Sequence, residues 1–516
     1  MQTDSGTTRS DPVALPGSAI VAVIGAGTMG SGIAQVAATA GHTVLLYDSA
    51  PDAVGRGLSV ITGALDRAVA KGQLAEEARA TIVGRLHPCS DLAELAGVDL
   101  AVEAIVEDLA VKQALFTRLE AVVSDRCILA TNTSSISIES IGAPLARPGR
   151  FAGLHFFNPA PVMALVEIVS GRATDPDVAA CLHATAAAWG KVPVHARSTP
   201  GFIVNRVARP FYAEALRVLA EGGADPATVD AVVRECGGFR MGPCELMDLI
   251  GHDVNYAVTR SVWEAFHFDP RFQPSLVQRA LVEARWLGRK TGRGFYDYQG
   301  GAKTEPANAA PAPAPGSVAL TGSLGPAAAL VPLLRDAGIA VEEVSGPGGL
   351  RVGRALLAPT DGRLATERAS EESAEVILFD WALDYAAAKR IALAPAQQTS
   401  PEALVQSVGL FQALGKEVSV IGDVPGMVVA RTVAMLANEA ADALNQQVAD
   451  AAAIDLAMRK GVNYPVGPLS WADRIGPRYV LHLLDNLART YGEDRYRASP
   501  LLRKCALSGR GLSSME

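Results

Sequence analysis

The chain has 516 residues, of which 49% are hydrophobic and 19% are charged, and its formal net charge is −8. A chain of this length and composition is globular and can build three or four hydrophobic cores. Its acidic balance and its lack of basic clusters argue against nucleic acid or an anionic membrane surface as the main partner.

The first 17 residues, MQTDSGTTRSDPVALPG, are predicted to be a flexible N-terminus, because they are polar and lack an apolar core of signal-peptide length. No run of about 18 apolar residues follows. The six cysteines show no C-x-x-C spacing, so we expect reduced thiols and no metal site. These features predict a cytoplasmic protein with no membrane partner.

A Val- and Ile-rich run before residue 25 predicts a buried strand that leads into a glycine motif. Gly25, Gly27 and Gly30 form G-x-G-x-x-G, and Thr28 and Met29 lie between the last two glycines. In this motif two glycines allow a tight turn close to a pyrophosphate, and the third lets the helix pack on the strand. The context predicts a dinucleotide site, and a Gly-rich structural turn is the alternative.

The next predicted strand, TVLLYD, ends at Asp48. A carboxylate at this place suits the ribose 2′-hydroxyl of NAD and would repel the 2′-phosphate of NADP. The motif therefore favours NAD, whereas a solvated carboxylate at a strand end is the alternative interpretation.

Strand and helix signals alternate from residue 18 to about 199, which predicts an α/β Rossmann domain with a doubly wound parallel sheet. One strand ends near Glu103, and another, CILATNTSS, runs into a polar turn. Ligands of open α/β sheets bind at such strand ends.

Residues 151–167, FAGLHFFNPAPVMALVE, place His155 and Glu167 just beyond these strands. A histidine that is backed by a carboxylate beside a nicotinamide is the minimum equipment for oxidising an alcohol, since imidazole exchanges a proton near neutral pH. The alternative is a core histidine that happens to meet a glutamate.

From residue 200 to 298 the alternating strand and helix signals give way to amphipathic helical patterns, which predicts an all-α helical domain. The Pro- and Ala-rich tract 299–316 is predicted to be an extended linker. We expect a helical domain that closes over the cofactor domain.

The rear of the chain is an internal repeat, visible when residues 189–211 are aligned without a gap on residues 414–436. We expect a reduced Rossmann-like domain at 317–421 and a second helical domain at 422–516. In this copy the glycine turn is shortened to Gly322 and Gly325, Ala430 replaces Asn205, and nothing resembles HFFNP. A degenerate, non-catalytic repeat of both domains is therefore predicted.

Five motifs in order, G-A-G-T-M-G, V-E-A-I-V-E-D, N-T-S-S, H-F-F-N-P and T-P-G-F-I-V-N-R, resemble the NAD-dependent 3-hydroxyacyl-CoA dehydrogenase family. The resemblance is close over residues 18–298 and loose over 317–516. The layout is similar to that of long bacterial members that act on 3-hydroxybutyryl-CoA or on 3-hydroxyadipyl-CoA, the latter in phenylacetate degradation. It implies NAD as cofactor and an acyl-CoA substrate.

The resemblance also implies roles for four residues. His155 would take the proton from the substrate's C3 hydroxyl, and Glu167 would orient the imidazole. Ser134 would bind the C3 oxygen near the nicotinamide, and Asn205 would hold the same oxygen or the thioester. A helix cap and a satisfied interdomain amide are the alternatives for Ser134 and Asn205.

Charged residues are implied in cofactor and CoA binding. Glu107, Lys112 and Lys290 match family positions that contact NAD. Lys71 matches a lysine that meets the CoA phosphates, although Ala64 stands where the family has a nearby serine. Solvated surface positions are the alternative for all four.

Two other function classes are alternatives for this sequence. A 6-phosphogluconate or 2-hydroxy-acid type of oxidoreductase would need a catalytic lysine in the helical domain or an arginine clamp, and the HFFNP motif argues against it. A non-catalytic NAD-binding or crystallin-like protein would have lost His155, Glu167, Ser134 or Asn205, which are all present.

The resemblance also bears on the oligomeric state. Family members that have a single copy of the two domains pair through their helical domains, so we expect a homodimer or a pseudo-dimeric monomer.

Overall fold

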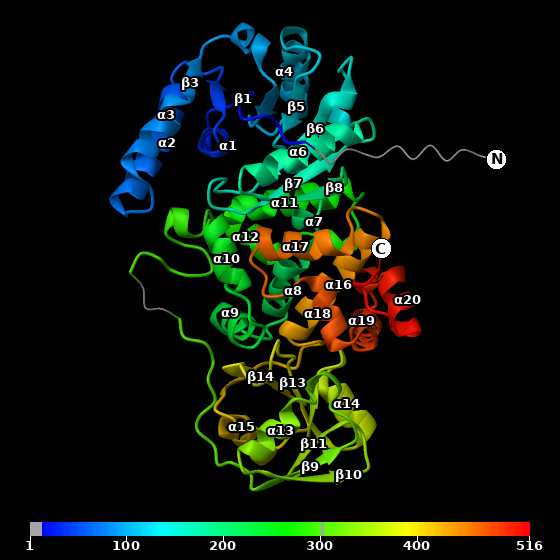
Figure 1. Ribbon diagram of the computed structural model, residues 1–516. Helices are drawn as coiled ribbons and strands as arrows, with labels where there is room; N and C mark the ends of the chain where they lie inside the picture. Colours follow the sequence, from blue (N-terminus) through cyan, green and yellow to red (C-terminus); the bar gives the residue numbers. More distant parts are fainter. Residues whose placement is uncertain (1–12, 301–303, 516) are drawn as a thin grey trace, which may run out of the picture. The chain divides into compact units, whose positions relative to one another are not determined.

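The computed structural model describes residues 13–300 and 304–515. They divide into two compact units, one up to Val204 and one from Asn205 onward (Figure 1). The predicted flexible N-terminus lies mostly outside the described residues. Within the described part of the chain, none of the helices combines the length and apolarity needed to cross a membrane.

The first unit is built on an eight-stranded sheet with the order β3-β2-β1-β4-β5-β6-β7-β8. Neighbouring strands are parallel except at β6 and β7, which run antiparallel, so the prediction of a wholly parallel sheet is wrong at this pair. Residues 157–164 are too short for the crossover that a parallel pair needs, and they form a hairpin instead. The strands are β1 (Ile20–Ile24), β2 (Thr43–Tyr47), β3 (Leu86–Cys89), β4 (Leu100–Glu103), β5 (Ile128–Thr131), β6 (Phe151–Phe156), β7 (Leu165–Ser170) and β8 (Val192–Arg197).

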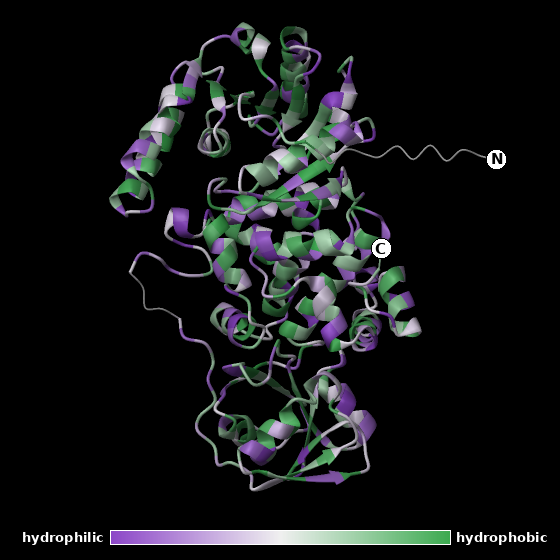
Figure 2. Ribbon diagram, viewed as in Figure 1, coloured by the Kyte–Doolittle hydropathy of each residue, from purple (hydrophilic) through white to green (hydrophobic). Residues whose placement is uncertain are grey.

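Helices follow most of these strands and cover the sheet. The inner strands are mostly hydrophobic, as their green ribbons show (Figure 2). Side chains such as Val21, Val102 and Leu154 are almost fully buried. Such continuous apolar runs are typical of strands that are covered on both faces. The helices are α1 (Thr28–Thr39), α2 (Ala53–Ala70), α3 (Glu76–Gly84), α4 (Leu109–Val122), α5 (Ile138–Gly142) and α6 (Pro176–Ala188).

The second unit holds two helical copies. The helical domain is repeated, as predicted, because a second set of helices lies near the end of the chain. The front copy comprises α7 (Val204–Val207), which begins at the unit boundary, α8 (Arg209–Ala220), α9 (Pro226–Glu235), α10 (Pro243–Ile250), α11 (His252–Ala265) and α12 (Leu276–Glu283). The rear copy comprises α16 (Val429–Asn445), α17 (Ala451–Gly461), α18 (Pro468–Ile475), α19 (Pro477–Tyr491) and α20 (Pro500–Ser508).

Equivalent aspartates hold equivalent helices in the two copies. Asp230 accepts hydrogen bonds from the first amides of α10, at Cys244 and Glu245, and Asp455 does the same at the start of α18. Asp248 and Asp473 each accept two backbone amides from the end of their own copy. The repeat is therefore preserved in its capping interactions as well as in its sequence.

The two copies contact each other through reciprocal ion pairs. Arg206 of the front copy meets Glu439 of the rear copy at 2.6 Å, and Arg431 of the rear copy meets Glu214 of the front copy at 3.2 Å. At the repeat offset of 225, Arg206 corresponds to Arg431 and Glu214 to Glu439. This is the self-complementary pattern of a two-fold dimer interface, formed here within one chain.

The reduced Rossmann-like domain contains a seven-stranded sheet with the order β10-β9-β11-β12-β13-β14-β15. Its strands are β9 (Ser317–Thr321), β10 (Ala340–Val344), β11 (Gly349–Val352), β12 (Ala355–Pro359), β13 (Glu375–Phe379), β14 (Arg390–Pro395) and β15 (Glu417–Val420), with helices α13 (Leu330–Asp336), α14 (Ala365–Glu372) and α15 (Pro401–Ala413).

The glycine turn of this second sheet leads into no long helix. A short 3-10 turn follows β9, and α13 begins only at Leu330. In the first sheet, α1 begins at Thr28, directly after the glycine loop. The second sheet therefore lacks the helix N-terminus that a pyrophosphate requires.

The described part of the predicted linker, residues 304–316, has no helix or strand, but it is docked on the reduced domain. Ala309 donates its amide to the carbonyl of Val418, and Ala312 donates to the side chain of Gln412. Backbone hydrogen bonds to the sheet and to α15 hold this Pro- and Ala-rich segment in place.

Candidate active site

The glycine loop is shaped by close contacts at two of its three glycines. Gly25 has a φ of +106°, and a Cβ there would lie 2.4 Å from the carbonyl oxygen of Ala104. A Cβ on Gly30 would lie 1.7 Å from the carbonyl oxygen of Gly25, so α1 packs directly on the turn. Both positions therefore require glycine for the fold itself.

Gly27 differs, because a Cβ there would meet no atom within 4 Å. It is the N-cap of α1, and it and Thr28 are exposed. The first amides of a helix have no partner within the helix, and they attract anions. Met29 follows in the same first turn. The open space at Gly27 thus fits the pyrophosphate of a dinucleotide.

Asp48 links the second strand to this loop. One carboxylate oxygen accepts the amide of Ala26 at 2.8 Å, and the other accepts the amide of Ala50 at 2.9 Å. Asp48 also lines a cavity of about 470 Å³, together with Tyr47, Ile105 and Val111. A mostly apolar cavity that ends at a carboxylate suits an adenine ring and its ribose.

Glu103, at the end of β4, is joined to α4 by a buried ion pair and to the end of β5 by a hydrogen bond. Lys112 of α4 donates to Glu103 at 2.5 Å, and both side chains are almost fully buried. Thr131 donates to the other oxygen of Glu103 at 2.6 Å. Lys112 also meets Glu107 at 3.2 Å. This lysine therefore positions the loop in which Glu107 lies.

Glu107 fastens that loop to the polar turn after β5. Its carboxylate accepts hydrogen bonds from the hydroxyl of Thr133 and from the amides of Ser134 and Ser135. Burial alone would raise the pKa of the Glu107 carboxyl, but Lys112 and these hydrogen bonds lower it overall. Glu107 is thus an ionised anchor that holds Ser134 in the turn.

His155 and Glu167 are brought together by the hairpin of β6 and β7. In the strand register the two residues are direct partners, and His155 Nδ1 lies 2.6 Å from Glu167 Oε2. Glu167 is fully buried, and His155 is 4% exposed. An ionised Glu167 fixes the proton of the ring on Nδ1, so that Nε2 can accept another proton.

Both carboxylate oxygens of Glu167 are engaged. Oε1 accepts the amides of Ile203 and Val204 at 3.0 Å each. The rings of Phe157 and Phe202 lie 4.6 and 5.6 Å from the imidazole, centroid to centroid. Glu167 can therefore neither rotate nor leave the imidazole without breaking backbone hydrogen bonds.

The remaining predicted residues lie in other elements of the chain. Asn205 is half-buried and opens the second unit, where its carbonyl accepts a bond from Arg209. Lys290 pairs with Asp253 at 2.5 Å, also in the second unit. Lys71 is exposed at the end of α2. Their proposed contacts with substrate or cofactor stay predictions.

Sequence reasoning missed several site residues. Asn132 accepts the amide of Phe156 at 2.8 Å and so ties β5 to the strand that carries His155. Glu103 was read only as a strand end, although it anchors Lys112. The residues of the cavity beside Asp48 are mostly apolar and come from strand ends, loops and α4, so no linear motif marks them.

Comparison with known proteins agrees with this geometry. Residues 20–199 match the 3-hydroxyacyl-CoA dehydrogenase NAD binding domain, and residues 201–298 and 426–512 match its C-terminal domain. Residues 357–425 match the 3-hydroxybutyryl-CoA dehydrogenase reduced Rossmann-fold domain. The chain belongs to the 3-hydroxyacyl-CoA dehydrogenase family. The resemblance seen in the motifs is thereby confirmed.

Individual relatives extend this result. The chain is 46% identical over 96% of its length to the 3-hydroxyadipyl-CoA dehydrogenase of Escherichia coli K12, of which it covers 98%. It is 42% identical over 54% of its length to the 3-hydroxybutyryl-CoA dehydrogenase of Bradyrhizobium diazoefficiens, of which it covers 95%.

Solved structures show the same layout. A crystal structure of 3-hydroxybutyryl-CoA dehydrogenase from Escherichia coli K12 aligns with a TM-score of 0.88 at 45% identity, over 95% of this chain and 99% of that one. The chain is therefore an oxidoreductase of the 3-hydroxyacyl-CoA dehydrogenase type, and nothing in these comparisons favours a non-catalytic structural protein.

Proposed function

We propose that the protein oxidises the C3 hydroxyl of an (S)-3-hydroxyacyl-CoA, that His155 is the base, and that a six-carbon dicarboxylic acyl chain is the preferred substrate. The single observation that carries the chemistry is the buried pair of His155 and Glu167 at 2.6 Å. The relative that matches nearly the whole chain is named for 3-hydroxyadipyl-CoA, which supports the acyl chain.

The chain's own residues fit an NAD site, because Gly27 leaves open space at a helix N-terminus and Asp48 borders a cavity of about 470 Å³. NAD, when bound, supplies the acceptor for the hydride that leaves C3. Glu107 and Lys112 would shape the loop beside it, and Lys290 would assist from the second unit.

Proton transfer is the task of the dyad. Nε2 of His155 takes the proton of the C3 hydroxyl, and Glu167 stabilises the imidazolium that results. In the reverse direction the imidazolium returns the proton to the forming alkoxide. Ser134 and Asn205 would donate hydrogen bonds to the C3 oxygen, which stabilises its negative charge without adding a titrating group. Lys71 would meet the phosphates of CoA.

The pairing of the helical copies supports a pseudo-dimeric monomer. Reciprocal ion pairs such as Arg206 with Glu439 already occupy the surface through which single-length relatives are expected to pair. The six free cysteines agree with a reducing compartment, which supports a cytoplasmic location. Light scattering should give the mass of one chain, 53.7 kDa. A mass twice as large would require another interface.

The test is the consumption of NADH by the purified full-length protein with 3-oxoadipyl-CoA, with acetoacetyl-CoA and with no acyl-CoA. We expect turnover of both acyl-CoA substrates, with a higher kcat/KM for the dicarboxylic one. His155→Ala should abolish turnover of both. Preference for acetoacetyl-CoA would overturn the proposed acyl chain, and activity that does not depend on His155 would overturn the proposed chemistry.

A further inference from the structure

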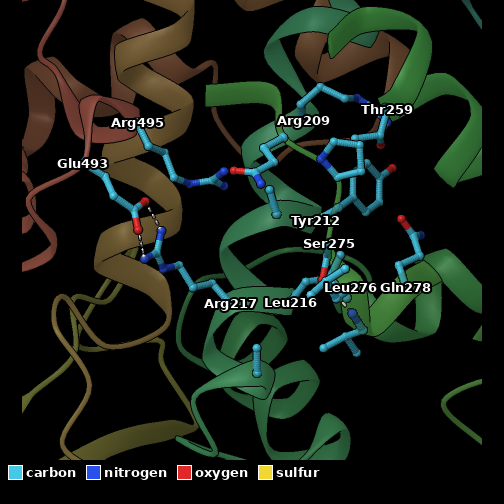
Figure 3. A pocket seen from close by; sticks show the side chains of 15 residues that line it. Arg209, Tyr212, Leu216, Arg217, Thr259, Ser275, Leu276, Gln278, Glu493 and Arg495 are labelled. Carbon is cyan, nitrogen blue, oxygen red and sulfur yellow. Dashed lines mark hydrogen bonds and ion pairs between the residues drawn. The ribbon is translucent and has the colours of Figure 1, made fainter. Parts of the chain in front are cut away.

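A cavity of about 320 Å³ lies entirely within the second unit (Figure 3). Arg209 and Tyr212 of α8, Thr259 of α11 and Gln278 of α12 line one side, and Arg217 with Glu493 lines the other. A water molecule takes about 30 Å³ in the liquid, so the cavity has room for a ligand tail of several heavy atoms. None of the residues to which a catalytic, cofactor-binding or CoA-binding role was given above lines this cavity.

Arg209 brings an uncompensated charge to the cavity. Arg209 is only 6% exposed to solvent, yet it forms no ion pair within residues 13–300 and 304–515. Every other buried arginine in those ranges meets at least one carboxylate: Arg150, Arg206, Arg271, Arg368, Arg390, Arg431 and Arg495. A buried charge is costly without a counter-ion, so this exception calls for an anionic partner.

The hydrogen bonds of Arg209 leave part of its guanidinium unused. Nε donates to the carbonyl of Asn205 at 2.8 Å, and Nη1 donates to Thr259 at 3.1 Å. No described residue accepts a hydrogen bond from Nη2, and none bonds to the hydroxyl of Tyr212, whose ring lies 5.0 Å from the guanidinium. Burial lowers the pKa of Arg209, but guanidinium remains charged at neutral pH.

The internal repeat shows that the fold does not need these polar groups. At the repeat offset of 225, Ala434, Ala437 and Leu484 stand in place of Arg209, Tyr212 and Thr259. All three are fully or nearly fully buried in the rear copy. The same helical packing therefore forms with apolar side chains, and only the front copy has polar side chains at these three positions.

We propose that Arg209 and Tyr212 bind the distal carboxylate of a dicarboxylic 3-hydroxyacyl-CoA, and that they set the preference for it over a monocarboxylic acyl chain. This inference rests on the proposed function and on the predicted role of Asn205 at the substrate's C3 oxygen. Asn205 lies in α7 and Arg209 begins α8, and the two residues are in direct contact, because Arg209 Nε donates to the carbonyl of Asn205 at 2.8 Å. Three bonds separate C3 of a hydroxyadipyl chain from its terminal carboxyl carbon, so one chain can reach both residues.

The decisive comparison uses two six-carbon substrates that differ only in the terminal group, 3-oxoadipyl-CoA and 3-oxohexanoyl-CoA, with acetoacetyl-CoA as the short reference. In Arg209→Ala, we expect kcat/KM for 3-oxoadipyl-CoA to fall by about 100-fold, the size of a lost charge-assisted hydrogen bond. The kcat/KM for acetoacetyl-CoA should stay within about 3-fold, and Tyr212→Phe should show a smaller loss of the same selectivity.

Arg217→Ala is the matched control, because Arg217 lines the same cavity but is already paired with Glu493 at 2.8 Å. It should leave the ratio between the six-carbon substrates unchanged. Equal losses for all substrates in Arg209→Ala would show a structural role, and an unchanged ratio would show that the carboxylate binds elsewhere. Either result overturns the proposal.

The same assays separate this inference from the proposed function. If wild-type protein reduces acetoacetyl-CoA in a His155-dependent manner but does not favour 3-oxoadipyl-CoA, the dehydrogenase chemistry stands and the carboxylate site fails. If wild-type protein turns over none of the three substrates, the proposed function fails. Calorimetric titration with adipyl-CoA and with hexanoyl-CoA then decides the site alone, since equal affinities for the two would reject it.

Discussion

His155 and Glu167 are direct partners across the antiparallel strands β6 and β7, although twelve positions separate them in the chain. The hairpin 157–164 sets this register, and the amides of Ile203 and Val204 hold the far oxygen of the carboxylate. The dyad is therefore fixed by backbone geometry before a substrate arrives, as a preorganised base requires.

Replacing Glu167 with glutamine should lower kcat much more than it changes KM. The amide can still accept from Ile203 and Val204, but it cannot stabilise a charged imidazole, and it no longer fixes the ring's proton on Nδ1. We expect kcat to drop by at least about 100-fold. Steady-state kinetics with acetoacetyl-CoA measures this, and a main effect on KM would argue against the assigned role.

Gly27 and Gly30 should respond differently to alanine. A Cβ on Gly27 meets nothing, so Gly27→Ala should leave the Tm nearly unchanged but raise the KM for NADH by about 10-fold or more, because the methyl group enters the pyrophosphate space. A Cβ on Gly30 collides with Gly25, so Gly30→Ala should lower the Tm by several degrees. Thermal melts and cofactor titrations test the pair, and a large loss of Tm in Gly27→Ala would contradict it.

Asp48→Asn should weaken the discrimination between NADH and NADPH. The carboxylate lies beside the glycine loop and would repel a 2′-phosphate, whereas an amide would not. We expect the ratio of kcat/KM values to shift toward NADPH by about 10-fold. Asp52→Asn removes the same charge nearby without a side-chain cap interaction and should leave the ratio unchanged.

Glu439→Gln should destabilise the protein strongly. Glu439 meets both Arg206 and Arg271, so its neutralisation leaves Arg206 buried without a carboxylate partner and Arg271 with Asp442 alone. Breaking a buried pair costs about 3–5 kcal/mol, whereas Glu283→Gln in an exposed pair should cost less than about 1 kcal/mol. Urea unfolding measures both, and equal effects would reject the structural role of the reciprocal pairs.

The same interface should make the protein sensitive to acid. Burial raises the pKa of Glu214, but Arg495 and Arg431 outweigh it and lower the pKa overall. A carboxyl whose folded pKa is depressed contributes stability above its unfolded pKa, and this contribution is lost as the pH falls through the folded value. Wild-type stability should therefore drop below about pH 4, and Glu214→Gln should flatten that part of the pH profile.

One NAD should bind per chain. The second sheet carries only a short 3-10 turn after β9, and α13 starts too late to offer its N-terminus to a phosphate. Calorimetric titration should give a stoichiometry of one, and Gly27→Ala should weaken that binding by about 10-fold or more. Two sites per chain would contradict the interpretation of the rear domain as degenerate.

The sequence by itself determined the family, the alternation of strands and helices in the first domain, and the repeat. The motifs that reveal them are local: a glycine loop between a strand and a helix, an acid at a strand end, and short runs such as N-T-S-S and H-F-F-N-P. These motifs consist of residues that are close together in the chain, so they can be recognised without knowing which distant segments come into contact.

Only the tertiary structure decided the reversed strand β7, the buried pair of Lys112 and Glu103, and the ion pairs between the helical copies. It also decided that Arg209 lines a cavity without forming an ion pair to any described residue, whereas Arg206 pairs with Glu439. Each of these depends on which distant residues become close, and whether a charge is buried or compensated is a property of the packed chain.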